Sequence, residues 1–239
     1  MATKEEAIKQ VDEYFSGKYD ITQGTAIPDV ADIPLGKNGR ELDLAMLFID
    51  IRESTKIVDG LHRITAARMY KSFLWGVAQI AKMNNGELRS FNGDGVLVAF
   101  IGETKRTNAA KAALQMSWFV KNVLKTKMES LFQNNQSLKD LEFEYGIGID
   151  VGKVLVVRGG IRGENNNDLV WVGNATNYAV KLSSISEAGY HVYISEDVYM
   201  NMNDFSKIGG DPKRNMWEER KWTDMDGIII YRSNWTWSL

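Results

Sequence analysis

Two periods of apolar residues alternate along this chain of 239 residues. Residues 4–16 repeat their apolar side chains at helical spacing, which predicts a short amphipathic helix. The segment that follows carries two of the three prolines and several glycines, as expected of a linker or a wrapping arm. We therefore divide the chain into an N-terminal helix and arm, residues 1–40, and one compact domain, residues 41–239.

Strand and helix patterns alternate through the compact domain. Helices are predicted over residues 54–83, 104–127 and 174–186. The first of them should begin at a cap on Ser54 or Thr55. Strands are predicted over residues 42–51, 87–91, 96–100, 141–152, 153–160, 168–173, 190–195, 216–222 and 227–232. The order β-α-β-β-α-β, with further strands behind it, predicts an α+β fold. We expect a ferredoxin-like sandwich, with a mostly antiparallel sheet and helices on one face.

Two aspartates stand where apolar strands end. Asp50 closes the run over residues 47–49, and Asp94 lies in the Asn-Gly-Asp-Gly turn of a predicted hairpin. The first strand and this hairpin are neighbours in such a sandwich, so both carboxylates are expected at one sheet edge. Each alone has a simpler interpretation, Asp50 as a helix cap and Asp94 as the favoured residue of a type I′ turn. Side by side, however, they repel each other unless a cation lies between them.

This pair of carboxylates predicts a site for Mg²⁺ or Mn²⁺. Oxygen ligands favour these cations, and magnesium commonly takes one or two carboxylates together with substrate phosphates. Two such ions about 3.5–4 Å apart can activate an attacking oxygen and stabilise a leaving one. Gly93 and Gly95 leave room for a phosphate or metal, and the amides of residues 51–55 could cradle phosphate oxygens at a helix start.

Composition narrows the chemistry further. The chain has no cysteine, which excludes disulfides, thiolate metal sites and cysteine nucleophiles and makes the cytosol the expected location. The two histidines, His62 and His191, fall in a helix start and a strand, so both are expected to be structural. A net charge of −2 gives no reason to expect nucleic acid or a membrane as partner. No apolar run approaches the ~20 residues of a membrane helix.

Four motifs resemble, in order and spacing, the class III nucleotidyl cyclases. They are LFIDIREST (47–55), FNGDGVLVAF (91–100), YGIGIDVGKVLVVRGG (145–160) and VWVGNATNYAVKLSS (170–184). The resemblance covers residues 42–232 and implies the same sandwich, paired head to tail as a homodimer with each active site between two subunits. In that family one subunit brings two metal-binding aspartates, which match Asp50 and Asp94. The carbonyl of Ile51 is implied as a further ligand, with two Mn²⁺ or Mg²⁺ ions per active site.

The resemblance also assigns residues to the partner's side of each site. Asn177 matches the asparagine that orients the ribose, and Lys181 stands where these enzymes usually have an arginine that stabilises the transition state. Positions i and i+4 share a helix face, so both side chains can reach one substrate. Lysine keeps the charge but lacks the bidentate fork of arginine.

The departures from the family pattern concern the base. Adenylate cyclases of this class read adenine with a lysine and an aspartate, and Ser90 and Val170 occupy those two places here. The neighbouring Trp171 is either a wall of the base pocket or a core residue. The absence of both charged groups resembles the pyrimidine cyclases of the Pycsar anti-phage systems. Those are cytosolic enzymes that make cyclic UMP or cyclic CMP, which activates a separate effector. We prefer UTP, since no acidic acceptor for a cytosine amine is evident.

Further candidate contacts follow from the size and charge of a nucleoside triphosphate. The predicted nucleotide-binding residues are Phe48, Thr55, Ser90, Val170, Trp171 and Lys221. A triphosphate needs cations around it, and the candidates for this role are Arg52, Arg89, Arg158 and Lys221.

Other functions stay open on the sequence alone. The first alternative to a uridylate cyclase is a cytidylate cyclase, and the second is an adenylate or guanylate cyclase with an unusual pocket. A degenerate cyclase domain that only senses a nucleotide is the alternative outside enzymes, and the lysine at position 181 is its best support. A diguanylate cyclase or polymerase palm shares the sandwich, but its hairpin would carry a paired acidic Gly-Gly motif.

Overall fold

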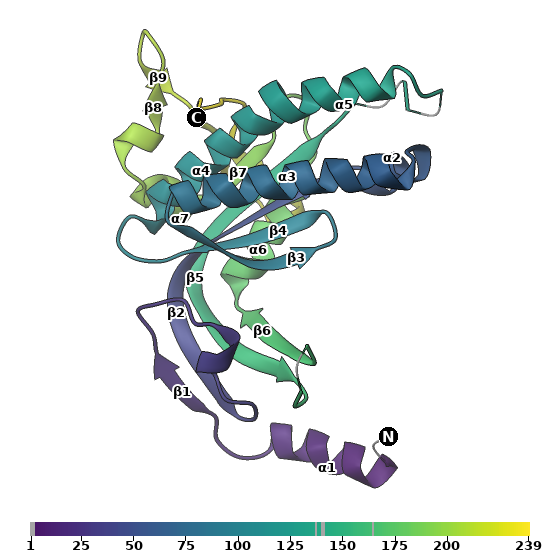
Figure 1. The fold of residues 1–239 in the computed structure, drawn as a ribbon. Coiled ribbons are helices and arrows are strands. Elements are labelled where there is room, and N and C mark those ends of the chain that lie inside the picture. The colour runs from purple at the N-terminus through teal and green to yellow at the C-terminus, as the bar shows by residue number, and fades with distance from the viewer. Residues whose placement is uncertain (1–2, 137, 140–141, 164) are drawn as a thin grey trace.

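A nine-stranded sheet forms the centre of the computed structural model, which describes residues 3–136, 138–139, 142–163 and 165–239 (Figure 1). Its strands are β1 (Asp20–Gln23), β2 (Asn38–Ile51), β3 (Gly86–Asn92), β4 (Gly95–Phe100), β5 (Tyr145–Gly160), β6 (Asn167–Val172), β7 (Val192–Ser195), β10 (Glu218–Trp222) and β11 (Ile228–Ser233). The strand order is β10-β11-β7-β5-β2-β4-β3, with β1 beside β2 and β6 beside β5. Among the strands that the structure describes, only the β1–β2 and β5–β7 pairs are parallel. The predicted α+β fold with a mostly antiparallel sheet is therefore confirmed.

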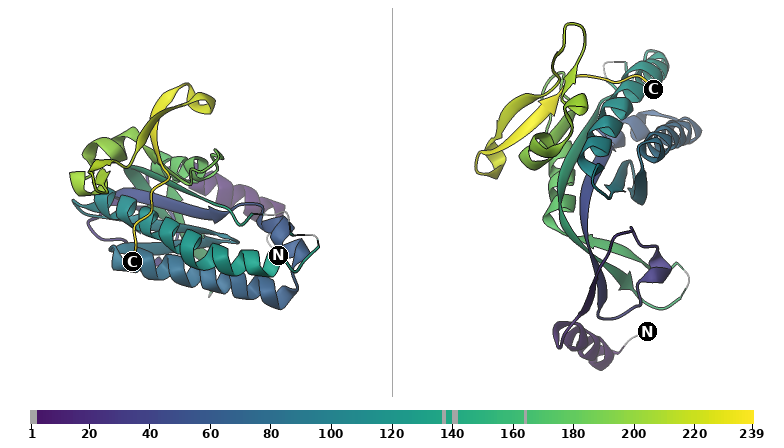
Figure 2. Two further views of the ribbon diagram at one scale, coloured as in Figure 1. Left: turned by 90° about the horizontal axis from the view of Figure 1, so that it is seen from above. Right: turned by 90° about the vertical axis from the view of Figure 1, so that its left-hand side faces the viewer.

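Helices cover both faces of this sheet (Figure 2). The described helices are α1 (Lys4–Phe15), α2 (Ser54–Gly60), α3 (Arg63–Met83), α4 (Lys105–Phe119), α5 (Lys125–Phe132), α6 (Asn174–Ser183) and α7 (Glu196–Asn201). Alternate residues of β2 enter two cores: Leu47 and Ile49 pack with α3 and α4, whereas Met46 and Phe48 pack with α6. The expectation that all helices lie on one face was therefore wrong for α6. Apolar residues on both sides of β2 require a cover on both faces.

β5 is one continuous strand rather than the predicted pair of strands over 141–152 and 153–160. It begins at Tyr145, and Leu141 lies outside the described residues. β5 stays paired with β2 along the whole of Gly39–Ile51, so no turn interrupts it at Gly152. The outer halves of β2 and β5, with β1 and β6, form an arm that extends from the body and ends near α1 (Figures 1 and 2).

The helical predictions differ from the structure mainly at helix ends. The predicted helix over 54–83 is divided into α2 and α3, because His62 accepts a hydrogen bond from the N–H of Ile64 and starts a second helix. The N-cap of α2 is Glu53, with a φ of 53°, rather than Ser54 or Thr55. The helix predicted to end at 127 continues through a π-helical turn, Val120–Leu124, to the end of α5.

The C-terminal part adds elements that the sequence pattern did not predict. They are α7 and a small two-stranded sheet of β8 (Ile208–Gly209) and β9 (Arg214–Asn215). Both histidines are structural, as predicted: His62 caps α3, and the buried ring of His191 stacks on Tyr145 at 4.4 Å. No helix in the described part of the chain is long and apolar enough to cross a membrane.

Helix α6 rests directly on glycines of β5. A Cβ built on Gly148 would lie 2.0 Å from the carbonyl oxygen of Ala179, far inside van der Waals contact. Gly152 lies four residues further along the same strand. A Cβ built there would meet only the Cβ of Ala175, at 3.8 Å. The helix can therefore approach the sheet closely at one position and not at the other.

We expect Gly148→Ala to destabilise the protein by about 3 kcal/mol, because the added methyl group must push α6 off the strand. Gly152→Ala is the matched control and should change the free energy of unfolding by less than about 0.5 kcal/mol. Urea unfolding followed by circular dichroism measures both. Equal effects of the two substitutions would contradict the close seating of α6.

Candidate active site

Asp50 and Asp94 meet at one edge of the sheet, as the sequence predicts. Ile49 pairs with Val96 across β2 and β4, which places Asp50 opposite Gly95 and next to the hairpin turn. Gly93 has a φ of 67° while Asp94 has no positive φ, a pattern of type II′ rather than the expected type I′. We refer to Asp50 and Asp94 together as the acidic tip.

The electrostatics of the acidic tip favour a cation. Burial, and after it the negative charge of Asp94, raise the pKa of Asp50 to about 6. Both carboxylates are only half-buried, so an ion can reach them from solvent. In the described residues no cluster of three or more acidic, histidine or cysteine side chains forms a complete metal cage. Two carboxylates and the backbone carbonyl of Ile51 fit a magnesium-type ion that takes its other ligands from substrate and water. The metal role of these three residues stays a prediction.

A row of three side chains runs across the sheet behind the acidic tip. Phe48 pairs with Leu97 on β4, and Leu97 pairs with Ser90 on β3, so all three share the face that α6 covers. The ring of Phe48 fills the space beside Gly95, where a Cβ would lie 2.3 Å from its Cζ. Ser90 is half-buried and follows a β-bulge at Arg89. The row places one hydroxyl group on an otherwise apolar floor.

Helices α2 and α3 supply a residue that sequence reasoning missed. Tyr70 of α3 is a hydrogen-bond partner of Ser54, and burial, then the charge of Asp94, raise the pKa of its hydroxyl. Its place beside the acidic tip depends on how α3 folds back over the sheet, and no local pattern marks it. Thr55, the predicted contact in the first turn of α2, is exposed.

Asn177 and Lys181 lie on the exposed face of α6, one turn apart. Lys181 and Lys221 share a cavity of about 460 Å³ between the end of α6 and the β10–β11 hairpin. We call it the basic cavity, and its lining residues are Lys181, Ser184, Ile185, Ser186, Glu187, Arg220, Lys221, Trp222, Thr223, Asp224, Met225 and Ile230. Nζ of Lys181 lies 3.7 Å from Sδ of Met225. The cavity therefore offers two lysines to an anionic ligand.

Three of the four cations proposed for the triphosphate are engaged elsewhere. Arg52 donates to the carbonyl oxygen of Ile185, and Arg89 donates to that of Pro28 at 3.2 Å. Arg158 donates to the side-chain oxygen of Asn167 at 2.8 Å. Lys221 differs, since it is exposed and none of the ion pairs described for this chain includes it. Lys221 is the best placed of the four to meet phosphates.

Val170 and Trp171 point in opposite directions from β6. Trp171 is a core residue that packs with Leu42 and Leu44, and its buried Nε1 has no described hydrogen-bond partner. Val170 is 47% exposed and lines a separate hollow with the 165–168 loop. Trp171 is therefore a core residue, and the base-reading role of Val170 stays a prediction.

The acidic tip and the basic cavity do not meet within one chain. Neither Asp50 nor Asp94 lines the basic cavity, whose wall includes the loop that follows α6. In a dimer, the acidic tip of one copy can lie against the basic cavity of the other copy, and the two together would form a complete site. The geometry accordingly fits a site built from two subunits, and dimerisation stays a prediction.

Two curated relatives match the chain along its whole length. A uridylate cyclase of Xanthomonas perforans is 34% identical over 240 residues, and the match covers all of both chains. A uridylate cyclase of Burkholderia cepacia is 33% identical over 241 residues, again covering all of both. No family model matches the chain.

Two solved structures with the same fold are an adenylyl cyclase and a guanylyl cyclase. A bacterial light-regulated adenylyl cyclase has a TM-score of 0.66 at 17% identity and covers 82% of this chain and 52% of its own. The guanylyl cyclase Cya2 has a TM-score of 0.64 at 20% identity, covering 83% of this chain and 95% of its own. At such identities these structures establish the shared fold.

We expect Asp50→Asn to raise the melting temperature at pH 8 without divalent metal by roughly 3–6 °C. The folded pKa of about 6 lies above the ordinary 3.8, so the folded state binds the proton more tightly than the unfolded state. The contribution of Asp50 to wild-type stability should therefore fall as the pH rises from about 4 to 6 and stay lower above that window. Asparagine removes this charge.

Thermal unfolding in EDTA at pH 4 and pH 8 measures the effect. At pH 4 the folded wild type carries a protonated Asp50, so the difference between the two proteins should nearly vanish. The same stabilisation at both pH values would contradict an electrostatic cause.

Proposed function

Because the chain belongs to the uridylate cyclases, a group of class III nucleotidyl cyclases, we propose that it converts UTP to 3′,5′-cyclic UMP and pyrophosphate. The observation that carries this proposal is its full-length similarity to relatives of that name. The pair of aspartates at the acidic tip and the two lysines of the basic cavity support a reaction on a nucleoside triphosphate.

The choice of base is supported by the residues at the two positions where related cyclases read a purine. Ser90 offers one hydroxyl group that can donate or accept a hydrogen bond, and Val170 offers none. A site built with charged purine-reading groups would reject a pyrimidine, and neither group is present at these two positions. The row of Phe48, Leu97 and Ser90 holds no acidic acceptor for a cytosine amine, which favours UTP over CTP.

The chain's own residues divide the work between two subunits of a cytoplasmic homodimer. Asp50, Asp94 and the carbonyl of Ile51 would hold two Mn²⁺ or Mg²⁺ ions, which when bound neutralise phosphate charge and activate the ribose 3′-hydroxyl. The 3′-oxygen forms a bond to the α-phosphorus as the bond to the leaving pyrophosphate breaks. Asn177 of the partner subunit orients the ribose, and the partner's Lys181 stabilises charge that develops on the α-phosphate.

The basic cavity would hold the rest of the triphosphate. Lys221 is exposed at its wall, and a charge-assisted hydrogen bond to a terminal phosphate is the contact that it can make. The cell biology that we propose follows the Pycsar resemblance. Cyclic UMP would serve as a second messenger in bacterial anti-phage defence and activate a separate effector. A rise of cyclic UMP in infected cells, measured by mass spectrometry, tests that role.

Incubation of the purified protein with ATP, GTP, CTP and UTP in separate Mn²⁺-containing reactions is the direct test. We expect cyclic UMP as the dominant product, resolved by mass, with turnover of the other three lower by at least about tenfold. Cyclic CMP as the main product would show that the protein is a cytidylate cyclase, with the same proposed mechanism. A cyclic purine as the main product would refute the interpretation of Ser90 and Val170.

Complementation tests the two-subunit site. A tip-deficient chain (Asp50→Asn, Asp94→Asn) and a cavity-deficient chain (Asn177→Ala, Lys181→Ala) should each be inactive alone. Mixed in equal amounts and allowed to exchange, they should recover about a quarter of wild-type activity. Half of the dimers are then mixed, and each mixed dimer has one intact site of two. Recovery of no activity, with mixed dimers demonstrated by affinity tags, would contradict this arrangement.

A further inference from the structure

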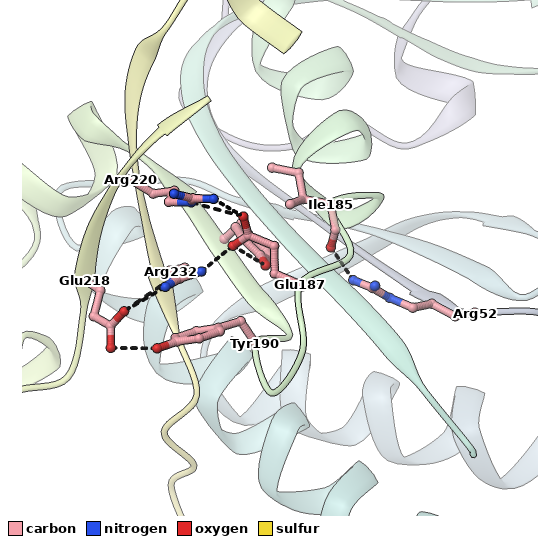
Figure 3. A network of polar contacts seen from close by, with 8 residues as sticks. Arg52, Ile185, Glu187, Tyr190, Glu218, Arg220 and Arg232 are labelled. Atoms are coloured by element: carbon pink, nitrogen blue, oxygen red, sulfur yellow. Dashed lines mark hydrogen bonds and ion pairs between the residues drawn. The ribbon is translucent and has the colours of Figure 1, made fainter. Parts of the chain in front are cut away.

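Arg52 lies two positions after Asp50 and ties the end of β2 to two other elements. Its backbone N–H donates to the carbonyl oxygen of Glu144 at 2.9 Å. Its half-buried guanidinium donates through Nη2 to the carbonyl oxygen of Ile185, directly beyond α6 (Figure 3). One side chain therefore reaches from the strand that carries the acidic tip to the end of the helix that borders the basic cavity.

The end of α6 has little freedom where Arg52 meets it. A Cβ built on Gly146 of β5 would lie 1.9 Å from the carbonyl oxygen of Ser183 and 3.1 Å from Nη2 of Arg52. The last carbonyl groups of a helix have no intrahelical partner, and cations near them are stabilising. Gly146 thus lets α6 sit against the strand, and Arg52 holds it there.

A cluster of ion pairs holds the other side of the same loop (Figure 3). Glu187 accepts hydrogen bonds from Arg220 at 2.8 and 3.0 Å and also from Arg232. Arg232 pairs with Glu218 at 3.1 Å, and the hydroxyl of Tyr190 donates to Glu218 at 2.7 Å. Both arginines belong to the β10–β11 hairpin, which forms the far wall of the basic cavity. The α6–β7 loop is therefore fixed between this hairpin and Arg52.

We propose that Arg52 is a positioning residue for the active site opposite to the one that its neighbouring aspartates serve. The inference rests on the proposed two-subunit site, in which the acidic tip of each protomer faces the basic cavity of its partner. In the sequence Arg52 lies beside the acidic tip, yet its guanidinium fixes the last turn of α6 and so orients Asn177 and Lys181. Each protomer then connects the two active sites of the dimer through one side chain.

Mixed dimers with a single working site separate the two possible roles of Arg52. In a purified dimer of one tip-deficient and one cavity-deficient chain, the tip-deficient chain supplies the working basic cavity. The cavity-deficient chain supplies the working acidic tip. Arg52→Gln is introduced into one chain or the other, and kcat and KM for UTP are measured for each placement. Arg68→Gln, a substitution of an exposed arginine on α3, is the matched control in both placements.

In the tip-deficient chain, Arg52→Gln should lower kcat about tenfold with a smaller change in KM, because a small misplacement of catalytic groups is costly. In the cavity-deficient chain, Arg52→Gln should change kcat less than about twofold, because the α6 of that chain belongs to the site that is already inactive. Arg52→Lys retains a donor and should recover most of the loss. Thermal unfolding and size-exclusion chromatography establish that each dimer is folded. If the glutamine variant does not fold, the remaining loss of activity of Arg52→Lys, expected in the tip-deficient chain and not in the cavity-deficient chain, decides.

The opposite placement dependence would show that Arg52 serves the metal aspartates beside it and would overturn the inference. Equal losses in both placements, or no loss in either, would overturn it as well. These outcomes leave the two-subunit site intact, since the parent mixed dimer is active in each case. A parent mixed dimer without activity would instead refute the two-subunit proposal, and the inference would fall with it.

Discussion

β2 and β5 pair along most of their length, from Gly39 opposite Val157 to Ile51 opposite Tyr145, and this ladder places both halves of the candidate site. One end of β2 brings Asp50 to the edge where the β3–β4 hairpin delivers Asp94. The same part of β5 presents the glycines on which α6 rests. A register shift of one residue would turn every side chain of β2 to the opposite face. The two cores on either side of β2 therefore fix the site geometry as well as the stability of the sheet.

The two halves of the site carry opposite unsatisfied charge. At the acidic tip, burial and a second carboxylate make the ionised form of Asp50 unfavourable. In the basic cavity, Lys181 and Lys221 take part in none of the described ion pairs, whereas Arg220 is neutralised by Glu187. Cations and a polyphosphate would relieve both conditions together. Salt bridges thus fix the wall of the basic cavity, whereas Lys181 and Lys221 stay available for a ligand.

The fold was largely predictable, because the elements with strong local signals formed as expected. The Asn-Gly-Asp-Gly turn made its hairpin, and the spacing of residues 4–16 gave α1. The errors arose where tertiary pairing outweighed a local signal. Gly152 lies inside β5 because β2 continues beside it, and α6 covers the second face because β2 is apolar on both sides. The break between α2 and α3 follows a cap made by His62, which has no strong propensity for that role.

The sequence was sufficient to predict the candidate chemical groups: the two aspartates at strand ends, the asparagine and lysine one helical turn apart, and the missing charges at positions 90 and 170. Spacing within one strand, turn or helix fixes these features, since it sets which side chains share a face. Which distant residues meet became evident from the tertiary structure. It assigned three of the four candidate cations to structural contacts and placed Tyr70 beside the acidic tip. It also joined Arg52 to Ile185, because such contacts depend on how helices pack across the sheet and not on any local period.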